Sequence, residues 1–290
     1  MTTLYSYFYR RFRCKAGDCR HSCCVSDWDI DIDDVTADIY RTTDGPLGDE
    51  LRRSMICRDG TFSFRMKKDG GCPFFREDGL CRIILEKGED YLCDICTMHP
   101  RFFVYAGDFE LAGVGLACEK SVELLLADTG PLYFIGETGK SWTLPQIFHA
   151  LGTEMTEEAL RFTPCTDLSY YKSLFSRLER TEPIDEAWTK RLSFLEKEIS
   201  RGAALTETYK ETVPASHLQR LYEYILYRSL EKMEMYGPEI LIRYARESTD
   251  FILMESALCG DFSENIRRWS EQIEYDTENV DILLTLLSDT

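Results

Sequence analysis

Closely spaced cysteines constrain this chain more than any other feature. Nine of its twelve cysteines stand in short motifs, and thiolates are preferred ligands of zinc and of iron–sulfur clusters. The motifs therefore predict metal ligation rather than core packing. The nine candidate ligands are Cys14, Cys19, Cys23, Cys24, Cys72, Cys81, Cys93, Cys96 and Cys118. Cys57, Cys165 and Cys259 have no motif around them, and we expect them to be buried free thiols.

Composition indicates a protein of the reducing cytoplasm. With 290 residues and 44% hydrophobic content, the chain can bury a core without disulfide bonds. The first thirteen residues lack the apolar region and cleavage site of a signal peptide. No apolar run approaches the ~20 residues of a membrane helix, so no membrane association is expected. A net charge of −17 argues against nucleic acid as a partner, because phosphate binding requires a basic surface.

We expect a mainly α fold with two parts. Residues 1–127 form an irregular, cysteine-rich, metal-binding part with a few short strands, such as 28–32 and 61–66, whose residues alternate in polarity. Residues 128–140, rich in Gly and Pro, are the expected linker to an all-helical part at 141–290. The predicted helices cover 33–43, 48–55, 118–127, 167–180, 184–199, 217–233, 238–251 and 265–287.

The cysteine spacing favours an iron–sulfur cluster over zinc. Structural zinc typically uses two Cys-x-x-Cys pairs, and only Cys93 and Cys96 have that spacing here. The adjacent Cys23 and Cys24 cannot easily share one small tetrahedral site. Iron–sulfur clusters are larger and accept more varied spacing. Zinc remains the alternative metal, and free structural thiols remain a third possibility.

The ordered motifs resemble a known cysteine-cluster family. Cys14-x4-Cys19-x3-Cys23-Cys24 with Trp28, then Gly71-Cys72-Pro-Phe-Phe75 and Leu80-Cys81, are similar to the Cys-x-x-Cys-x-x-Cys-Cys proteins. Cys96-Thr-Met-His-Pro-Arg101 and Leu116-Ala-Cys118-Glu119 resemble one branch, the flagellin lysine N-methylase family. The similarity covers residues 12 to about 126, and the helical remainder resembles the family only in general character.

The resemblance implies a methyltransferase that contains a metal cluster. It would transfer a methyl group from S-adenosylmethionine to lysine side chains of flagellin, and would hold an iron–sulfur cluster, of the 4Fe–4S type, with these cysteines. All candidates but Cys93 fall on motif positions, and Cys93 is retained as a less secure ninth. Because these exceed the four thiolates of one cubane cluster, either a second metal is present or several cysteines only flank the ligands.

Lysine methylation by itself needs no iron. A neutral amine attacks the methyl group of the sulfonium, so the enzyme must align the two and favour an amine whose ordinary pKa is about 10.4. The Cys-x3-Cys-x2-Cys motif of radical enzymes is absent, because Ser26 stands at its third position. We therefore favour a structural role for the cluster. No dinucleotide-type glycine motif locates the methyl donor or a catalytic base, and a non-enzymatic metal or redox module that docks a partner protein is the competing interpretation.

Overall fold

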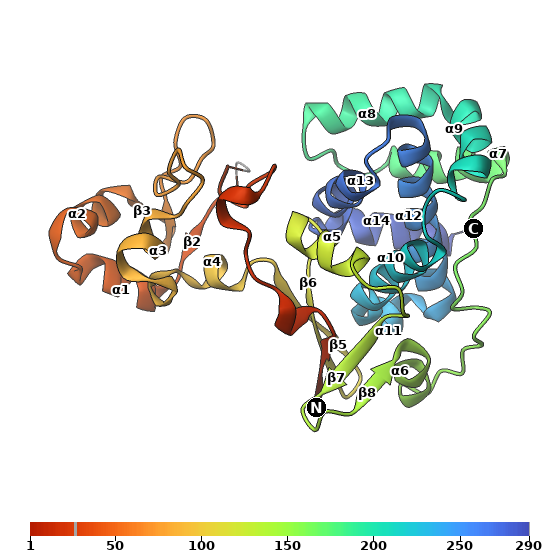
Figure 1. The fold of residues 1–290 in the computed structure, drawn as a ribbon, viewed down its shortest axis with the longest axis horizontal. Coiled ribbons are helices and arrows are strands. Elements are labelled where there is room, and N and C mark those ends of the chain that lie inside the picture. The colour runs from red at the N-terminus through yellow and green to blue at the C-terminus, as the bar shows by residue number, and fades with distance from the viewer. Residues whose placement is uncertain (26–27, 290) are drawn as a thin grey trace. The chain divides into compact units, whose positions relative to one another are not determined.

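The chain folds into two compact units, seen in a computed structural model that describes residues 1–25 and 28–289 (Figure 1). The cysteine unit comprises Arg13–Pro100. The helical unit combines Met1–Phe12 with the chain from Arg101 onward. About 55% of the chain is helical, which confirms the mainly α prediction.

The cysteine unit contains a small antiparallel sheet with short helices around it. Its strand order is β2-β4-β3, with Asp31 opposite Ser63 and Met55 opposite Phe64. Both strands that alternation predicted, near 28–32 and 61–66, are therefore present in shorter form. The elements are η2 (Ala16–Asp18), η3 (Cys23–Val25), β2 (Asp31–Ile32), α1 (Asp34–Thr42), α2 (Gly45–Ser54), β3 (Met55–Arg58), β4 (Thr61–Phe64), α3 (Arg82–Lys87), η4 (Glu89–Tyr91) and α4 (Asp94–Met98).

Asp33 connects two of these helices. One carboxylate oxygen accepts the Thr36 N–H at 2.9 Å and so caps the start of α1. The other accepts the Asp94 N–H at 3.0 Å, at the first residue of α4. This side chain thereby ties the strand and helix at 31–42 to the segment that carries Cys93 and Cys96.

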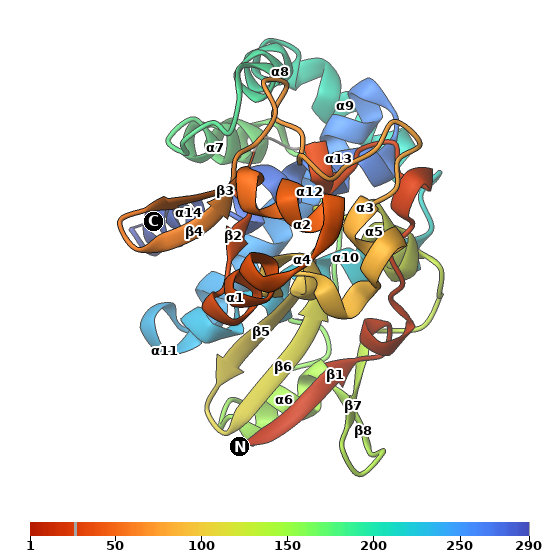
Figure 2. The ribbon, with the colours of Figure 1, turned by 90° about the vertical axis from the view of Figure 1, so that its left-hand side faces the viewer.

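The helical unit contains a mixed five-stranded sheet with the order β5-β6-β1-β7-β8. Strand β1 runs parallel to β6, with Thr2 opposite Phe109, and the other neighbours are antiparallel. Figure 2 shows β5, β6 and β1 side by side. The strands are β1 (Thr2–Ser6), β5 (Arg101–Ala106), β6 (Phe109–Val114), β7 (Tyr133–Gly136) and β8 (Ser141–Thr143).

Helix α12 (Pro238–Cys259) is central to the helical unit and contacts α7, α9, α10, α13 and α14 (Figure 1). Its residues 251–254 are all buried, so this apolar stretch of the helix is enclosed on every side. The other helices are η1 (Tyr9–Arg11), α5 (Glu119–Leu126), α6 (Leu144–Ala150), α7 (Leu168–Leu178), α8 (Glu186–Lys197), α9 (Ile199–Tyr209), α10 (Ala215–Arg228), η5 (Leu230–Lys232), α11 (Met233–Tyr236), α13 (Phe262–Trp269) and α14 (Thr277–Ser288).

The single helix predicted over 265–287 is interrupted. A π-helical turn, η6 (Ser270–Glu274), follows α13, and the Tyr275 N–H donates to the Ser270 carbonyl at 3.0 Å. Asp276 then accepts the Asn279 N–H at 3.2 Å and begins α14. The break therefore has a local cause. The backbone hydrogen bond there spans five residues instead of four, and Asp276 then caps the start of a new helix.

The two units are not divided where the sequence suggested. The expected linker at 128–140 contains β7, which pairs with β1, and the segment 101–127 contributes β5, β6 and α5 to the helical unit. The sequence does not show this because the pairing is non-local. Strand β1, at the N-terminus, lies between β6 and β7 and so joins the segments 101–127 and 128–140 to the same sheet. Cys118, at the start of α5, accordingly belongs to the helical unit.

Candidate metal centre

Five cysteines share the core of the cysteine unit. Cys72 and Cys93 are buried, at 7% and 1% exposure. Cys24, Cys81 and Cys96 are partly buried and pack against the same core. The apolar residues around them include Tyr40, Phe64, Phe74 and Ile83. Three separate motifs of the sequence are therefore brought together in one small volume.

Backbone hydrogen bonds fix how these segments meet. The Cys72 N–H donates to the Cys24 carbonyl at 2.8 Å, which joins η3 to the loop after β4. The Arg82 N–H donates to the Phe74 carbonyl at 2.9 Å and holds the start of α3, with Cys81, against that loop. Cys93 immediately precedes α4, so Cys96 follows within its first turn.

The thiols differ in their affinity for a proton. A hydrogen bond from Cys23 lowers the pKa of Cys24 to about 7. Burial raises the pKa of Cys72 to about 12, and burial also raises the pKa of Cys81. Cys93 and Cys96 form a pair in which the Cys96 thiol donates to Cys93, which lowers the pKa of Cys93 and raises that of Cys96.

All five thiols are coupled through their charges. Burial is the main cause of the raised pKa of Cys72 and Cys81, and the hydrogen bond with Cys93 is the main cause for Cys96. The negative charge of Cys24 adds to all three shifts, and Cys93 adds to the rise in pKa of Cys81 and of Cys96. Cys81 likewise adds to the rise for Cys72, and Cys72 adds to the rise for Cys96. Thiolates gathered in this core repel one another without a cation. A bound metal would offset that repulsion with its positive charge and would hold its thiolates deprotonated.

Backbone N–H groups also point at the sulfur atoms. Cys72 accepts from the N–H groups of Phe74 and Phe75, and Cys81 accepts from those of Ile83 and Ile84. Hydrogen bonds of this kind favour the thiolate over the thiol, and they tune the potential of thiolate-bound clusters. The chain thus supplies donors suited to two anionic sulfur ligands.

The aromatic residues of the motifs order the surrounding loops. The Trp28 indole Nε1 donates to the Cys23 carbonyl at 2.7 Å, and the His99 ring packs edge-on against Trp28 with 4.8 Å between centroids. Burial lowers the pKa of His99 to about 4, so its imidazole is neutral near pH 7. Tyr40 donates to the Tyr91 carbonyl at 2.8 Å beneath the cysteines.

The remaining candidates lie elsewhere. Cys23 adjoins the five core cysteines through its hydrogen bond to Cys24. Cys14 is exposed and its sulfur accepts the Ala16 N–H at 3.3 Å, while Cys19 is partly exposed. Cys118 is partly exposed in the helical unit. The expectation of burial for the three cysteines outside motifs is wrong, since Cys57 is exposed, and Cys165 and Cys259 are partly exposed.

Within residues 1–25 and 28–289, no three Cys, His, Asp or Glu side chains converge tightly enough to enclose a single metal ion. The ligands of an iron–sulfur cluster need not converge on one point, because each thiolate binds its own iron atom at a separate corner of the cluster. The five core cysteines fit such a cluster in chemistry, and four of them would be enough for one cubane cluster.

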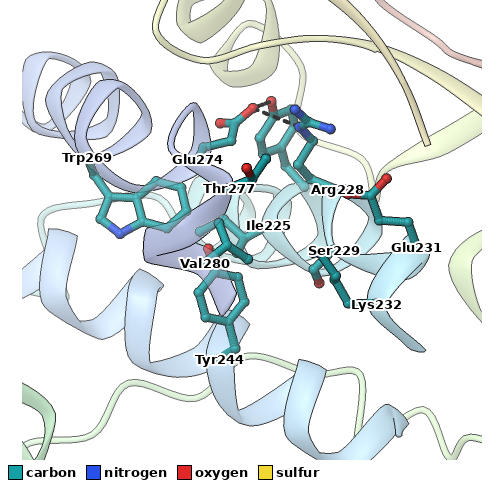
Figure 3. A pocket seen from close by; sticks show the side chains of 11 residues that line it. Ile225, Arg228, Ser229, Glu231, Lys232, Tyr244, Trp269, Glu274, Thr277 and Val280 are labelled. Carbon is teal, nitrogen blue, oxygen red and sulfur yellow. Dashed lines mark hydrogen bonds and ion pairs between the residues drawn. The ribbon is translucent and has the colours of Figure 1, made fainter. Parts of the chain in front are cut away.

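Two cavities that could hold small molecules lie in the helical unit. One, in Figure 3, sits between α10 and the η6 turn and has about 30 Å³ of free space, enough for a water molecule or two. Its acidic wall is Glu274, which accepts from the Tyr224 hydroxyl at 2.6 Å and from Arg228 Nε at 3.2 Å. A second, larger groove follows α12. No motif in the sequence pointed to either.

Comparison with known proteins gives no relative from which a function could be transferred. The chain matches no protein-family model, no curated protein and no solved structure. None of the helices in the described part of the chain is both long and apolar enough to cross a membrane. The fold and site therefore define a mainly α protein with a cysteine-lined core in its smaller unit.

Proposed function

We propose that the cysteine unit binds a 4Fe–4S cluster through the thiolates of Cys24, Cys72, Cys81 and Cys96. The convergence of these cysteines, from three separate motifs, in one core carries the proposal. A cubane cluster takes four thiolates, and Cys93 is then a hydrogen-bond partner of Cys96 rather than a ligand. When bound, such a cluster supplies a redox-active iron centre and cross-links the loops that hold it.

The ligand set requires reduced thiols. We therefore place the protein in the cytoplasm, where disulfides are rare and cysteines remain available to metals. Zinc is the alternative metal, since a tetrahedral zinc ion also accepts four thiolates. The two metals differ in colour, because thiolate-bound iron absorbs visible light and thiolate-bound zinc does not.

Purification under anaerobic conditions tests the metal. We expect brown protein with about four iron atoms and about four sulfide ions per chain. Cys72→Ser should remove most of the iron, whereas Cys57→Ser, which changes an exposed cysteine on β3 of the same unit, should retain it. Colourless protein that contains zinc, or equal iron content in both variants, would reject the proposed centre.

We further propose that the protein methylates lysine side chains of flagellin with S-adenosylmethionine as methyl donor. The support for this activity is the resemblance of the ordered cysteine motifs between Cys14 and Cys118 to flagellin lysine N-methylases. The reaction requires a lysine amine that has lost its proton. Burial of the amine favours this state, because an apolar environment lowers the pKa of an ammonium group.

A non-enzymatic module remains the second candidate. Its support is a group of exposed apolar side chains on the helices that follow the core cysteines, namely Leu85 on α3 and Met98 on α4, which suit contact with a partner protein. Methyl transfer to purified flagellin, detected by mass spectrometry of tryptic peptides, separates the two. Protein with its full iron content that leaves flagellin unmodified in the presence of S-adenosylmethionine would favour the module.

A further inference from the structure

Helix α12 presents a line of charged side chains to a groove in the helical unit. Arg243, Arg246, Glu247 and Asp250 recur at spacings of three and four, so they share one face of the helix. Together with residues 163–173 they line a groove of about 450 Å³. This volume lies within the range of small-molecule sites, about 300–1,000 Å³. A neighbouring opening shares Thr163 and Arg246 with it.

Asp250 forms the acidic floor of the groove and is only 2% exposed. One carboxylate oxygen accepts the Cys165 N–H at 3.0 Å, and the other accepts the Tyr170 hydroxyl at 2.8 Å. Both donors are neutral. A carboxylate offers about four acceptor positions, so these two hydrogen bonds leave capacity for a ligand.

Several buried carboxylates of the helical unit have an arginine partner, as Figure 3 shows for Glu274 and Arg228. Glu247 pairs with Arg177 through two hydrogen bonds, of 2.5 and 2.9 Å, and Glu255 pairs with Arg191 at 2.7 Å. Among the described residues no lysine or arginine forms a salt bridge to Asp250. A buried carboxylate without a hydrogen-bonded cation is costly. Arg246 acts on Asp250 through its charge but no salt bridge joins the two, so a ligand ammonium could provide the hydrogen-bonded cation. The pKa of Asp250, raised to about 7 by burial, agrees with that deficit.

Arg246 lies one turn before Asp250, an axial rise of about 6 Å along the helix. Its Nη2 donates to the carbonyls of Ala159 and Arg161, at 3.0 and 2.8 Å, which fixes the guanidinium in place. A further hydrogen bond joins it to the Tyr222 hydroxyl. A guanidinium carries five N–H donors, more than these three contacts use, so Arg246 can also bind an anionic group.

We infer that the α12 groove binds a small zwitterion of the α-amino acid type, with its ammonium group on Asp250 and its carboxylate on Arg246. A simple cation would meet the positive charges of Arg243 and Arg246, and a simple anion would meet the negative charge of Asp250. A ligand with adjacent opposite charges satisfies both ends. Glu247 already forms a salt bridge with Arg177, so Asp250 is the carboxylate that remains to bind the ammonium group of the ligand.

Two sources could provide this chemistry: a free amino acid, or the amino-acid end of S-adenosylmethionine. The inference does not depend on the proposed methyl transfer. If that proposal is right, however, the groove would hold the methionine part of the methyl donor.

Calorimetric titration of the full-length protein, with its metal bound, tests the inference. The probes are L-methionine, S-adenosylmethionine, the decarboxylated amine of methionine, which lacks the carboxylate, and its deaminated acid, which lacks the ammonium. We expect L-methionine or S-adenosylmethionine to bind, and each single-charge analogue to bind at least about tenfold more weakly than methionine.

Two variants locate the binding. Asp250→Asn and Arg246→Gln should each weaken binding of the zwitterion by about tenfold or more, because each removes one charge-assisted contact. Arg201→Gln, an exposed change on α9, is the matched control. If Asp250→Asn fails to fold, the comparison of Arg246→Lys with Arg246→Gln decides, since only lysine keeps the positive charge.

Binding of neither zwitterion, or binding that either variant leaves unchanged, would overturn the assignment. Failure of the groove assignment can be distinguished from failure of the proposed methyltransferase activity. Flagellin methylation with donor binding unaffected by both variants would refute the groove and keep the methyltransferase. Variant-sensitive binding without any methylation would keep the groove and refute the methyltransferase.

Discussion

Asp250 makes the stability of the helical unit depend on pH in a direction that can be calculated. Burial raises the pKa of this carboxyl from 3.8 to about 7, with Glu247 acting in the same direction and Arg246 opposing it. A group whose pKa is higher in the folded than in the unfolded state stabilises the fold when protonated. Its contribution is complete below about pH 4 and is lost as pH rises through about 7.

The magnitude follows from the two pKa values. At 1.36 kcal/mol for each pKa unit, the difference amounts to about 4 kcal/mol over the whole range. Between about pH 5 and about pH 8, roughly 3 kcal/mol of this should be lost from the free energy of unfolding. Asp250→Asn has no carboxyl to titrate at this position, so its stability should fall less over the same interval.

Urea unfolding followed by tryptophan fluorescence measures the effect, because Trp188 and Trp269 are buried in the helical unit. The informative quantity is the difference in unfolding free energy between Asp250→Asn and wild type at each pH. Asp289→Asn, which removes an exposed carboxyl at the end of α14, serves as control. A difference for Asp250→Asn that stays constant from about pH 5 to about pH 8 would refute the reasoning, since the carboxyl would then be ionised throughout.

Three further outcomes are expected. Cys72→Ser should lower bound iron from about four atoms per chain to a small fraction by metal analysis, while Cys57→Ser should not. Arg220→Met should lower the unfolding free energy by about 3 kcal/mol in urea, because the buried guanidinium donates to the carbonyl of Leu125 at the end of α5, at 2.7 Å, and to that of Gly130 in the following loop, at 2.9 Å; an unchanged midpoint would contradict this. Asp167→Ala should cost about 1 kcal/mol by removing the N-cap of α7, and Asp167→Ser should restore most of it.

The sequence predicts the helices better than the sheet because helix signals are local. Asp167 and the apolar positions of α10 and α12 lie within a few residues of the structure they specify. Strand β1 pairs with β6 across more than one hundred residues, with Leu4 opposite Leu111. No pattern within either segment shows that partner. The division into units depends on the same pairing, which explains why the boundary expected at 128–140 does not coincide with it.

The sequence predicts that cysteines form the candidate metal centre, but it does not predict which of them lie together. Motif spacing identified nine cysteines without distinguishing those that share a core. That distinction depends on contacts such as the hydrogen bond from the Cys72 N–H to the Cys24 carbonyl, which joins residues far apart in the chain. It also depends on Cys118 lying in the other unit.

The groove differs from the candidate metal centre, because its residues form no motif from which a binding site could be predicted. Arg243, Arg246 and Asp250 read as one polar stripe of a helix, and a polar stripe ordinarily faces solvent. Burial of Asp250 comes from the segment around Cys165 and Tyr170, about eighty residues earlier, which covers this face of α12. Only that tertiary contact turns a solvated carboxylate into an unpaired buried one.

The two candidate sites lie in different units and share no residue, so each can be removed separately. This separation allows the role of the proposed cluster to be tested. If the cluster only holds the cysteine unit together, Cys72→Ser protein should lose iron yet bind L-methionine at the groove as wild type does. If methionine binding is lost as well, while the helical unit keeps its unfolding free energy, a purely structural role for the proposed cluster is refuted.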